Sequence, residues 1–263
     1  MNIVVCLKQV PGTTEVRIDP ETNTLVREGI ENIINPFDTY AIEEGVRLKE
    51  KHGGKVTVIT MGPAQAEAAL REAVSLGADE TVLLSDRAFA GADTWATAFT
   101  LSCAVKKLEK PDLIICGRQT IDGDTGQVGP ELAEMLDIPF IAYVSRIEEI
   151  KEGYLRVRRM VEEGHEVIET TLPAVITVAK EINVPRLPSL RGIMKSKSAK
   201  IETWGIKELG VDESKVGLAG SSTQVIKVFF PQRVHQAEIL EGTLEERVDT
   251  LIDRLRNAGL CQG

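Results

Sequence analysis

The chain has 263 residues and a formal net charge of −9, and 43% of its residues are hydrophobic while only 4% are aromatic. This length suffices for one large domain, or for one domain and a substantial appendage, with a core that needs no disulfides. The acidic balance argues against sequence-independent nucleic-acid binding, which depends on Lys and Arg neutralising phosphates. The aliphatic composition favours an α/β protein over an aromatic-rich β-barrel.

Four cysteines and three histidines are present, and none of them has the spacing of a metal site or a disulfide framework. No His-based catalysis is expected. The chain has no run approaching the ~18 apolar residues that a membrane helix needs, and no basic segment followed by an apolar signal core. We therefore expect a cytoplasmic protein with no membrane insertion and no bound metal.

Up to about residue 136, short apolar runs alternate with amphipathic helical patterns. Near-continuous apolar runs are typical of strands buried on both faces of a parallel sheet. The expected strands are residues 2–7, 56–60, 81–84 and 113–116, and the expected helices are residues 36–51, 64–76, 94–108 and about 124–136. This alternation predicts an α/β fold with a doubly wound, mostly parallel sheet, which binds ligands beyond the carboxyl ends of its strands.

Two early segments have more local signals. Residues 11–31 mix turn-forming residues with alternating segments at 16–18 and 24–26, so we expect a loop that contains a small hairpin. Asn35 and Pro36 together predict a helix start, because asparagine caps free N–H groups and proline fits the first helical position.

After Pro139 the pattern changes to an alternation of period two, which predicts an antiparallel extension of the sheet. The expected strands of this part are residues 140–144, 154–161, 166–171 and 174–178. Beyond Asn183 the chain loses its strand and helix alternation and ends in an amphipathic helix at about 243–257. We therefore expect an α/β domain, residues 1–184, followed by a C-terminal arm, residues 185–263, that wraps a partner.

The loop from Gly117 to Pro130 follows an apolar strand and leads into a helix, for which Asp124 or Thr125 is the expected N-cap. Its glycines permit positive φ angles and close approach of a ligand, and the free N–H groups of the helix suit a phosphate. The glycine spacing matches neither the dinucleotide fingerprint nor a P-loop. The loop therefore predicts a phosphate-binding site of another type, with Arg118 as a countercharge.

Several segments, in this order, resemble one known family. They are Val5-Cys6-Leu7-Lys8-Gln9-Val10, Asn35-Pro36-Phe37-Asp38, Met61-Gly62-Pro63-Ala64-Gln65, Leu76-Gly77-Ala78-Asp79, the loop from Gly117 to Pro130, Leu172-Pro173-Ala174-Val175-Ile176-Thr177, and Pro185-Arg186 with Ile193-Met194-Lys195. Over essentially its whole length the chain is similar to the beta subunit of electron-transfer flavoproteins. The resemblance implies an adenine-nucleotide α-hydrolase-like fold, in which residues 1–184 are the nucleotide-binding domain. It also implies a heterodimer with an alpha subunit, on which residues 185–263, a recognition loop and the C-terminal arm, pack.

The resemblance also implies where a nucleotide binds. Its adenosine part falls on Cys6, Asn35, Phe37, Asp38 and Met61, and its phosphates fall on Gly117, Arg118, Gln119, Thr120, Asp122, Gly123, Asp124, Thr125, Gly126, Gln127, Val128 and Gly129. The negative carboxylates of Asp122 and Asp124 would repel a phosphate. They are therefore expected to accept hydrogen bonds from the backbone or from a ribose. Leu190 corresponds to the leucine that this family inserts into partner dehydrogenases.

The identity of the nucleotide divides the family. Classical members hold a structural AMP in the beta subunit, whereas electron-bifurcating members hold a second FAD that takes a hydride from NADH. Gly123 and the ending Val128-Gly129-Pro130 resemble the bifurcating form, so FAD is expected and AMP is the alternative. Electrons then pass to the alpha-subunit FAD and to ferredoxin or flavodoxin, in the service of an acyl-CoA or other dehydrogenase. No side chain needs to act as an acid or a base.

Two other classes of function are alternatives to an electron-transfer subunit. A non-redox adenine-nucleotide-binding module of the same fold is expected to form a homodimer without flavin, and the long tail after Asn183 argues against it. An ATP-pyrophosphatase-like ligase would need a Ser-Gly-Gly-x-Asp-Ser type of loop after the first strand. The segment Lys8-Gln9-Val10-Pro11-Gly12 does not supply one.

Overall fold

The computed structural model describes residues 1–12, 17–18, 25–26, 31–226 and 237–260 of the chain. They belong to two compact units, Met1–Val225 and Ile226–Gly263, and each unit is described by itself. The first unit extends beyond residue 184, where the sequence pattern suggests a division, because residues 185–225 pack on the α/β core.

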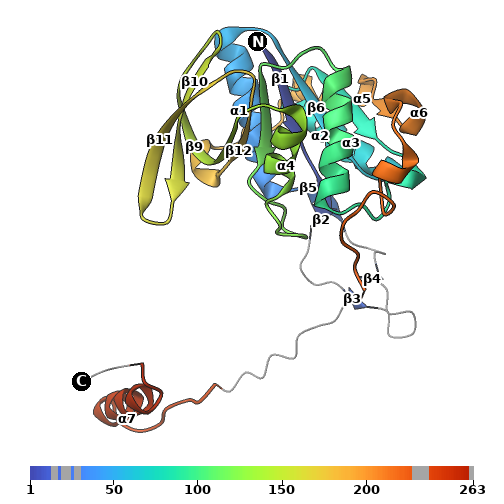
Figure 1. Ribbon diagram of the computed structural model, residues 1–263. Coiled ribbons are helices and arrows are strands. Elements are labelled where there is room, and N and C mark those ends of the chain that lie inside the picture. The colour runs from blue at the N-terminus through green and yellow to red at the C-terminus, as the bar shows by residue number, and fades with distance from the viewer. Residues whose placement is uncertain (13–16, 19–24, 27–30, 227–236, 261–263) are drawn as a thin grey trace. The chain divides into compact units, whose positions relative to one another are not determined.

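The first unit is built on one large sheet. Its strands are β1 (Asn2–Cys6), β6 (Lys55–Met61), β7 (Glu80–Leu84), β8 (Leu113–Gly117), β9 (Phe140–Lys151), β10 (Tyr154–Val161), β11 (Gly164–Thr171), β12 (Ala174–Val178) and β13 (Glu202–Trp204). They lie in the order β11-β10-β9-β12-β8-β1-β6-β7-β13. Figure 1 shows β10 and β11 at one end of this sheet. All neighbours from β9 to β13 in this order pair in parallel, and β10 pairs antiparallel with β9 and β11. This arrangement confirms the predicted α/β class, with a mostly parallel sheet and an antiparallel extension.

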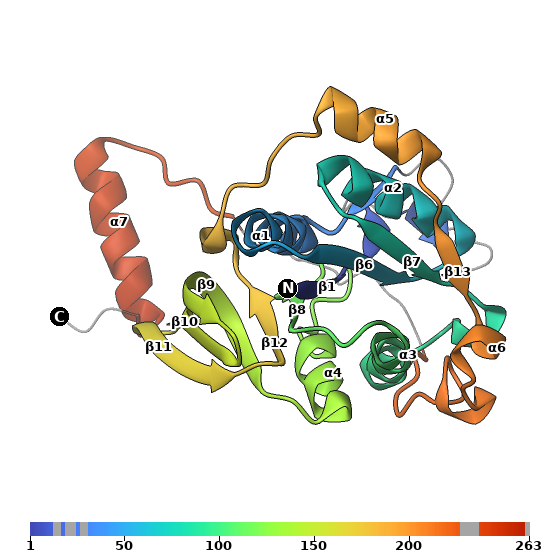
Figure 2. The same ribbon diagram turned by 90° about the horizontal axis from the view of Figure 1, so that it is seen from above.

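Helices cover both faces of the sheet. They are α1 (Pro36–His52), α2 (Glu67–Leu76), α3 (Thr94–Lys107), α4 (Val128–Leu136), α5 (Leu190–Ser198) and α6 (Ile206–Leu209). Figure 2 shows α1, α2 and α5 on one face and α3, α4 and α6 on the other. Successive residues of β1 supply both layers, since Val5 packs with the α1 and α2 side and Val4 packs with the α3 and α4 side. The continuous apolar run at the start of the chain is therefore explained by burial on two faces.

Two small antiparallel pairs lie outside the main sheet. Strand β2 (Gln9–Pro11) pairs with β5 (Asn32–Ile34), and β3 (Arg17–Ile18) pairs with β4 (Leu25–Val26). The second pair confirms the hairpin that the alternating segments predict. Val16 and Thr24, which belong to those segments, lie outside the described residues. Short 3₁₀ turns occur at Ala64–Ala66, Arg87–Phe89, Lys180–Ile182 and Glu213–Lys215.

Strand β9 is longer than the predicted strand 140–144. It pairs with β12 only as far as Val144 and then continues as the partner of β10 up to Lys151. Its second half is rich in charged residues, and they form ion pairs across the hairpin, such as the pair between Arg158 and Glu148 at 2.9 Å. Because a solvated strand lacks a strong apolar alternation, the sequence pattern did not reveal this part.

Residues 185–225 return to the sheet. Helix α5 packs on α2, where the guanidinium of Arg71 donates to the carbonyl oxygens of Ser196 and Ala199 at 2.7 and 3.2 Å. Strand β13 then adds to the edge of the sheet beside β7, with Trp204 opposite Leu84. A strand of three residues is too short to give a periodic signal, so the sequence pattern missed it.

The second unit contains one described helix, α7 (Leu244–Asn257), which confirms the helix predicted at 243–257. A capping box begins it, since the Thr243 hydroxyl accepts from the N–H of Glu246 and the Glu246 carboxylate accepts from the N–H of Thr243. Its apolar side chains, Leu244, Val248, Leu251 and Ile252, are exposed. Across the described residues, no helix combines the length and the apolarity that crossing a membrane requires.

Candidate functional site

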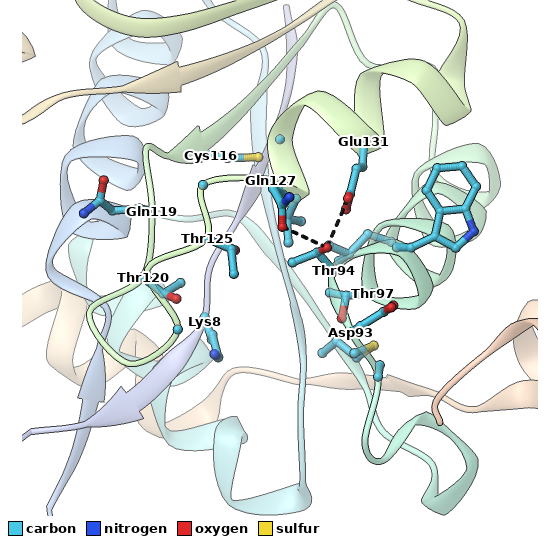
Figure 3. Close-up of a pocket in the computed structure, with 18 of the residues that line it drawn as sticks. Lys8, Asp93, Thr94, Thr97, Cys116, Gln119, Thr120, Thr125, Gln127 and Glu131 are labelled. Carbon is cyan, nitrogen blue, oxygen red and sulfur yellow. Dashed lines mark hydrogen bonds between the residues drawn. The ribbon is translucent and has the colours of Figure 1, made fainter. Parts of the chain in front are cut away.

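A pocket of about 940 Å³ opens at the carboxyl edge of the parallel sheet. One wall comes from the residues that follow β1 and β8, and the other comes from the start of α3 and from residues 222–225. Figure 3 shows Lys8, Thr120 and Thr125 on one side of the pocket and Asp93, Thr94 and Thr97 on the other. The pocket lies where a parallel α/β sheet is expected to bind its ligand.

Most of the residues that the sequence predicts for a nucleotide line this pocket. They are Asp38, Met61, Gly117, Arg118, Gln119, Thr120, Gly123, Thr125, Gly126, Gln127, Val128 and Gly129. The residues Cys6, Asn35, Phe37, Asp122 and Asp124 do not line it, and they support residues that do. The structure thus brings the predicted adenosine residues and the predicted phosphate loop to one edge of the sheet.

The loop after β8 is braced by two of these supporting residues. Asn35 occupies the N-cap position of α1, as the sequence predicts, but its side chain makes no capping hydrogen bond. Instead its Nδ2 donates to the carbonyl of Gln119 at 2.9 Å, and its Oδ1 accepts from the N–H of Ile121 at 3.2 Å. The carboxylate of Asp122 accepts from Nζ of Lys8 at 2.7 Å. The loop is therefore fastened both to the start of α1 and to the end of β1.

Two more of the supporting residues, Asp124 and Cys6, are neighbours of residues that line the pocket. Asp124 accepts a hydrogen bond from Nε2 of Gln119. Cys6 is buried beside Cys116, its partner in the pairing of β1 with β8, and it is Cys116 that lines the pocket. The hydrogen bond to Cys116 and burial raise the pKa of the Cys6 thiol well above its ordinary value.

Helix α4 begins at Val128, with Gln127 at the N-cap position, so the prediction of Asp124 or Thr125 as the N-cap is wrong. Asp124 has a φ of 54° and Gly126 has a φ of 64°, and left-handed residues cannot continue a right-handed helix. Of the glycines in the loop, only Gly126 has a positive φ. At Gly129 a Cβ would lie 2.6 Å from Cγ2 of Thr177, so close packing of α4 on β12 requires this glycine.

The start of α4 faces the ligand space. Gln127, Val128 and Gly129 all line the pocket. The first N–H groups of a helix have no partner within the helix and give this end a partial positive charge. An anionic group such as a phosphate is therefore stabilised here.

Asp38 connects three elements at the floor of the pocket. Its side chain is only 4% exposed, and its two oxygens accept from the N–H of Lys8 at 2.7 Å and from the N–H of Gly117 at 3.2 Å. Burial raises the pKa of Asp38 to about 7, although hydrogen bonds from Lys8, Asn35 and Gly117 oppose the shift. At Gly117 a Cβ would overlap Asp38 and the backbone of Phe37, so glycine is needed for this close approach.

Arg118 supplies a cation at the same edge. Its guanidinium carbon lies 5.2 Å from the ring centroid of Phe37 and 5.5 Å from that of Tyr143, which is the range of cation–π contacts. Its Nε donates to Oε1 of Gln119 at 2.8 Å. Within the described residues no carboxylate lies at ion-pair distance from this guanidinium. The charge is therefore available to an anionic ligand in the pocket.

Comparison with known proteins identifies the family. A family model described as the electron transfer flavoprotein domain matches residues 22–209. The chain is 52% identical over 258 residues to the electron transfer flavoprotein subunit beta of Thermoanaerobacterium thermosaccharolyticum, and the match covers 98% of each chain. The chain belongs to the electron-transfer flavoprotein family, in its beta-subunit group.

Two further relatives of this electron-transfer flavoprotein chain have other names. It is 46% identical over 258 residues to the caffeyl-CoA reductase-Etf complex subunit CarD of Acetobacterium woodii, with 97% of this chain and 98% of the relative covered. It is 46% identical over 249 residues to the protein FixA of Azotobacter vinelandii, with 92% and 89% covered. The resemblance inferred from the sequence is thereby confirmed at the level of the family.

Sequence reasoning missed the second wall of the pocket in this family member. Asp93 caps α3 by accepting from the N–H of Ala96 at 3.0 Å, and its other oxygen accepts from the N–H and hydroxyl of Thr223 at 2.9 and 3.1 Å. Asp93 thus fixes residues 222–225 as part of the pocket. The Asp93-Thr94 sequence before a helical pattern is a recognisable N-cap signal, whereas nothing in the sequence around Thr223 indicates its partner.

The second wall meets the start of α4 through hydroxyl and carboxylate groups. The Thr94 hydroxyl donates to Oε1 of Glu131 at 3.0 Å and lies 3.4 Å from Oε1 of Gln127, as the dashed lines in Figure 3 mark. Burial raises the pKa of Glu131, and the nearby charge of Asp93 acts in the same direction. This end of the pocket is acidic, in contrast to the end at Lys8 and Arg118.

Proposed function

We propose that the chain is the beta subunit of a heterodimeric electron-transfer flavoprotein and that its pocket binds FAD. The observation that supports FAD most directly is the extent of the pocket. Its volume of about 940 Å³ lies near the top of the usual range of small-molecule sites, ~300–1,000 Å³. Phe89, Trp95 and Leu101 also line the pocket, and their apolar side chains suit a large planar group.

Gly123 supports the same choice. Its φ is not in the left-handed region, and a Cβ there would meet only the Thr120 hydroxyl, at an ordinary distance of 3.5 Å. Neither the backbone nor the packing of the chain therefore requires glycine at this position. Gly123 lines the pocket, and the absence of a side chain enlarges the space for the ligand.

The chemistry of the site divides between cofactor and protein. When bound, FAD would supply the redox chemistry, namely acceptance of a hydride from NADH and release of its two electrons along separate routes. The chain itself holds the pyrophosphate on the loop between Gly117 and Gly129 and at the start of α4, and Arg118 provides a countercharge. Asp38 keeps the ends of β1 and β8 together under the nucleotide. No side chain has to transfer a proton.

The names of the relatives support the proposed partners. Relatives are named as a subunit beta and as a subunit of a reductase-Etf complex, so we propose an alpha subunit and an acyl-CoA or other dehydrogenase as partners. The exposed apolar side chains of α7 suit packing on the alpha subunit, and Leu190, 84% exposed at the start of α5, suits insertion into a dehydrogenase. Ferredoxin or flavodoxin is the proposed low-potential acceptor.

Nucleotide analysis of the purified heterodimer tests the proposal. The complex is denatured, and the released FAD and AMP are quantified against the amount of protein. Two FAD per heterodimer is the expected result. One FAD and one AMP would replace the proposal with a classical electron-transfer flavoprotein, and a colourless homodimer with bound adenine nucleotide would indicate a non-redox module.

A further inference from the structure

Tyr143 has an unusual backbone conformation. Its φ is 57°, and the other non-glycine residues with positive φ in the described part of the chain are both aspartates, Asp124 and Asp137. Asparagine and aspartate tolerate the left-handed region, whereas a bulky aromatic residue there is a true outlier. Such strain persists only where the surrounding structure imposes it, and it is concentrated at functional sites.

A bulge in β9 imposes this conformation. Ile141 is opposite Ile176 of β12, and Val144 is opposite Val178, so β9 uses one residue more than β12 between these two pairs. The N–H of Tyr143 leaves the strand ladder and donates to the hydroxyl of Thr177 at 3.1 Å. The bulge lies at the carboxyl edge of the parallel sheet, where Val178 is also the partner of Gly117 of β8.

The bulge brings the ring of Tyr143 to Arg118. The N–H of Arg118 donates to the carbonyl of Val178 at 3.1 Å, so its backbone is fixed beside the bulge. The guanidinium is in contact with the rings of both Phe37 and Tyr143, at 5.2 and 5.5 Å from their centroids. The side chain of Tyr143 remains 43% exposed, so burial of the ring in the core does not explain the strain.

We propose that Tyr143 is a positioning residue, whose bulged backbone aims its ring at Arg118 and holds the guanidinium ready for the phosphates of the bound nucleotide. Tyr143 does not itself line the pocket, whereas Arg118 does. An arginine held by contacts with two rings loses less side-chain freedom when its ligand binds, so the ligand binds more tightly. The inference rests on the proposed function for the site's nucleotide, and it requires only that this nucleotide carries phosphate.

The test uses the full-length chain produced with its alpha subunit, in wild-type form and as Tyr143→Phe, Tyr143→Asn and Arg118→Gln variants. After nucleotide is removed, the dissociation constants of FAD and AMP are measured by titration, and the unfolding midpoint is measured by circular dichroism. Tyr143→Phe keeps the ring and should leave both quantities unchanged. Tyr143→Asn should raise the dissociation constant about tenfold without lowering the unfolding midpoint, because asparagine accepts a positive φ.

A double-mutant cycle and a matched control make the result specific. Tyr143→Asn should have no further effect on binding in the Arg118→Gln background, because its effect passes through Arg118. Asp137→Asn replaces another left-handed residue, at the end of α4, and should leave nucleotide binding unchanged. Additive effects of the two substitutions in the cycle would overturn the inference.

The outcomes also separate this inference from the proposed function. If the wild-type site binds AMP and not FAD, the FAD assignment fails, and the Tyr143 effect on the AMP dissociation constant still decides the inference. If FAD binds equally well to wild type and to Tyr143→Asn, the positioning role is overturned while the function stands. If Tyr143→Asn binds nucleotide normally but releases the alpha subunit, the positioning role is also overturned, because the ring of Tyr143 would then serve the subunit interface.

Discussion

Replacing Asp38 by asparagine should change how the stability of this protein depends on pH. Burial raises the pKa of Asp38 to about 7 in the folded chain, against an ordinary value of 3.8. A carboxyl group with a raised folded pKa binds a proton more readily in the folded state than in the unfolded state. Its contribution to stability is therefore fully present below the unfolded pKa and is lost as the pH rises through about 7.

The size of this effect follows from the two pKa values. The full shift corresponds to roughly 4 kcal/mol, of which roughly 2–3 kcal/mol is lost between about pH 5 and about pH 8. Asparagine has no charge to bury and so lacks this pH dependence. It also places an amide NH₂ against one of the two backbone N–H donors, from Lys8 or Gly117, and leaving a buried donor unpaired costs about 1–3 kcal/mol at every pH.

The assay is guanidinium unfolding of the nucleotide-free chain at about pH 5 and about pH 8, with wild type and Asp38→Asn measured side by side. The variant should gain roughly 2–3 kcal/mol relative to wild type on going to the higher pH. Asp112→Asn is the matched control, because the exposed Asp112 carboxylate also accepts a backbone N–H, from Asn2 at 2.7 Å. If the difference in unfolding free energy between wild type and Asp38→Asn is the same at both pH values, Asp38 is not a buried carboxyl group with a pKa near 7, and the reasoning is refuted.

Three other substitutions test separate parts of the site. Lys8→Met should lower the free energy of unfolding by less than about 1 kcal/mol, because the ion pair that Lys8 forms with Asp122 is partly exposed. The same variant should show faster hydrogen exchange in the loop after β8. Asp93→Asn should weaken the contact to Thr223 and speed nucleotide dissociation several-fold, as followed by flavin fluorescence; an unchanged rate would mean that residues 222–225 do not retain the ligand. Leu190→Ala should slow electron transfer to the partner dehydrogenase at least about tenfold while leaving NADH-dependent dye reduction unchanged, and an equal loss in both assays would place Leu190 outside the docking surface.

Regularity in the sequence explains which elements could be predicted. The strands β1, β6, β7 and β8 and the helices between them have clear periodicity and clear start signals, because burial on one or two faces imposes a local pattern. Parallel winding then determines that the loops after β1, β6 and β8 meet at one edge. The position of the pocket, and the glycine-containing loop that forms part of its wall, were therefore accessible from the sequence. The resemblance to a known family added the expectations of which residues hold the adenosine part and which nucleotide binds.

The sequence by itself determined the α/β class, the winding of the sheet and the edge at which the ligand space opens. Only the tertiary structure decided which side chains meet there: the side chain of Asn35, the N-cap residue of α1, fastens the loop, Thr223 completes a wall from far along the chain, and a bulge turns Tyr143 toward Arg118. The physical reason is that backbone periodicity is set by neighbours in sequence, whereas the partner of a polar or aromatic side chain is set by whichever distant segment packs beside it.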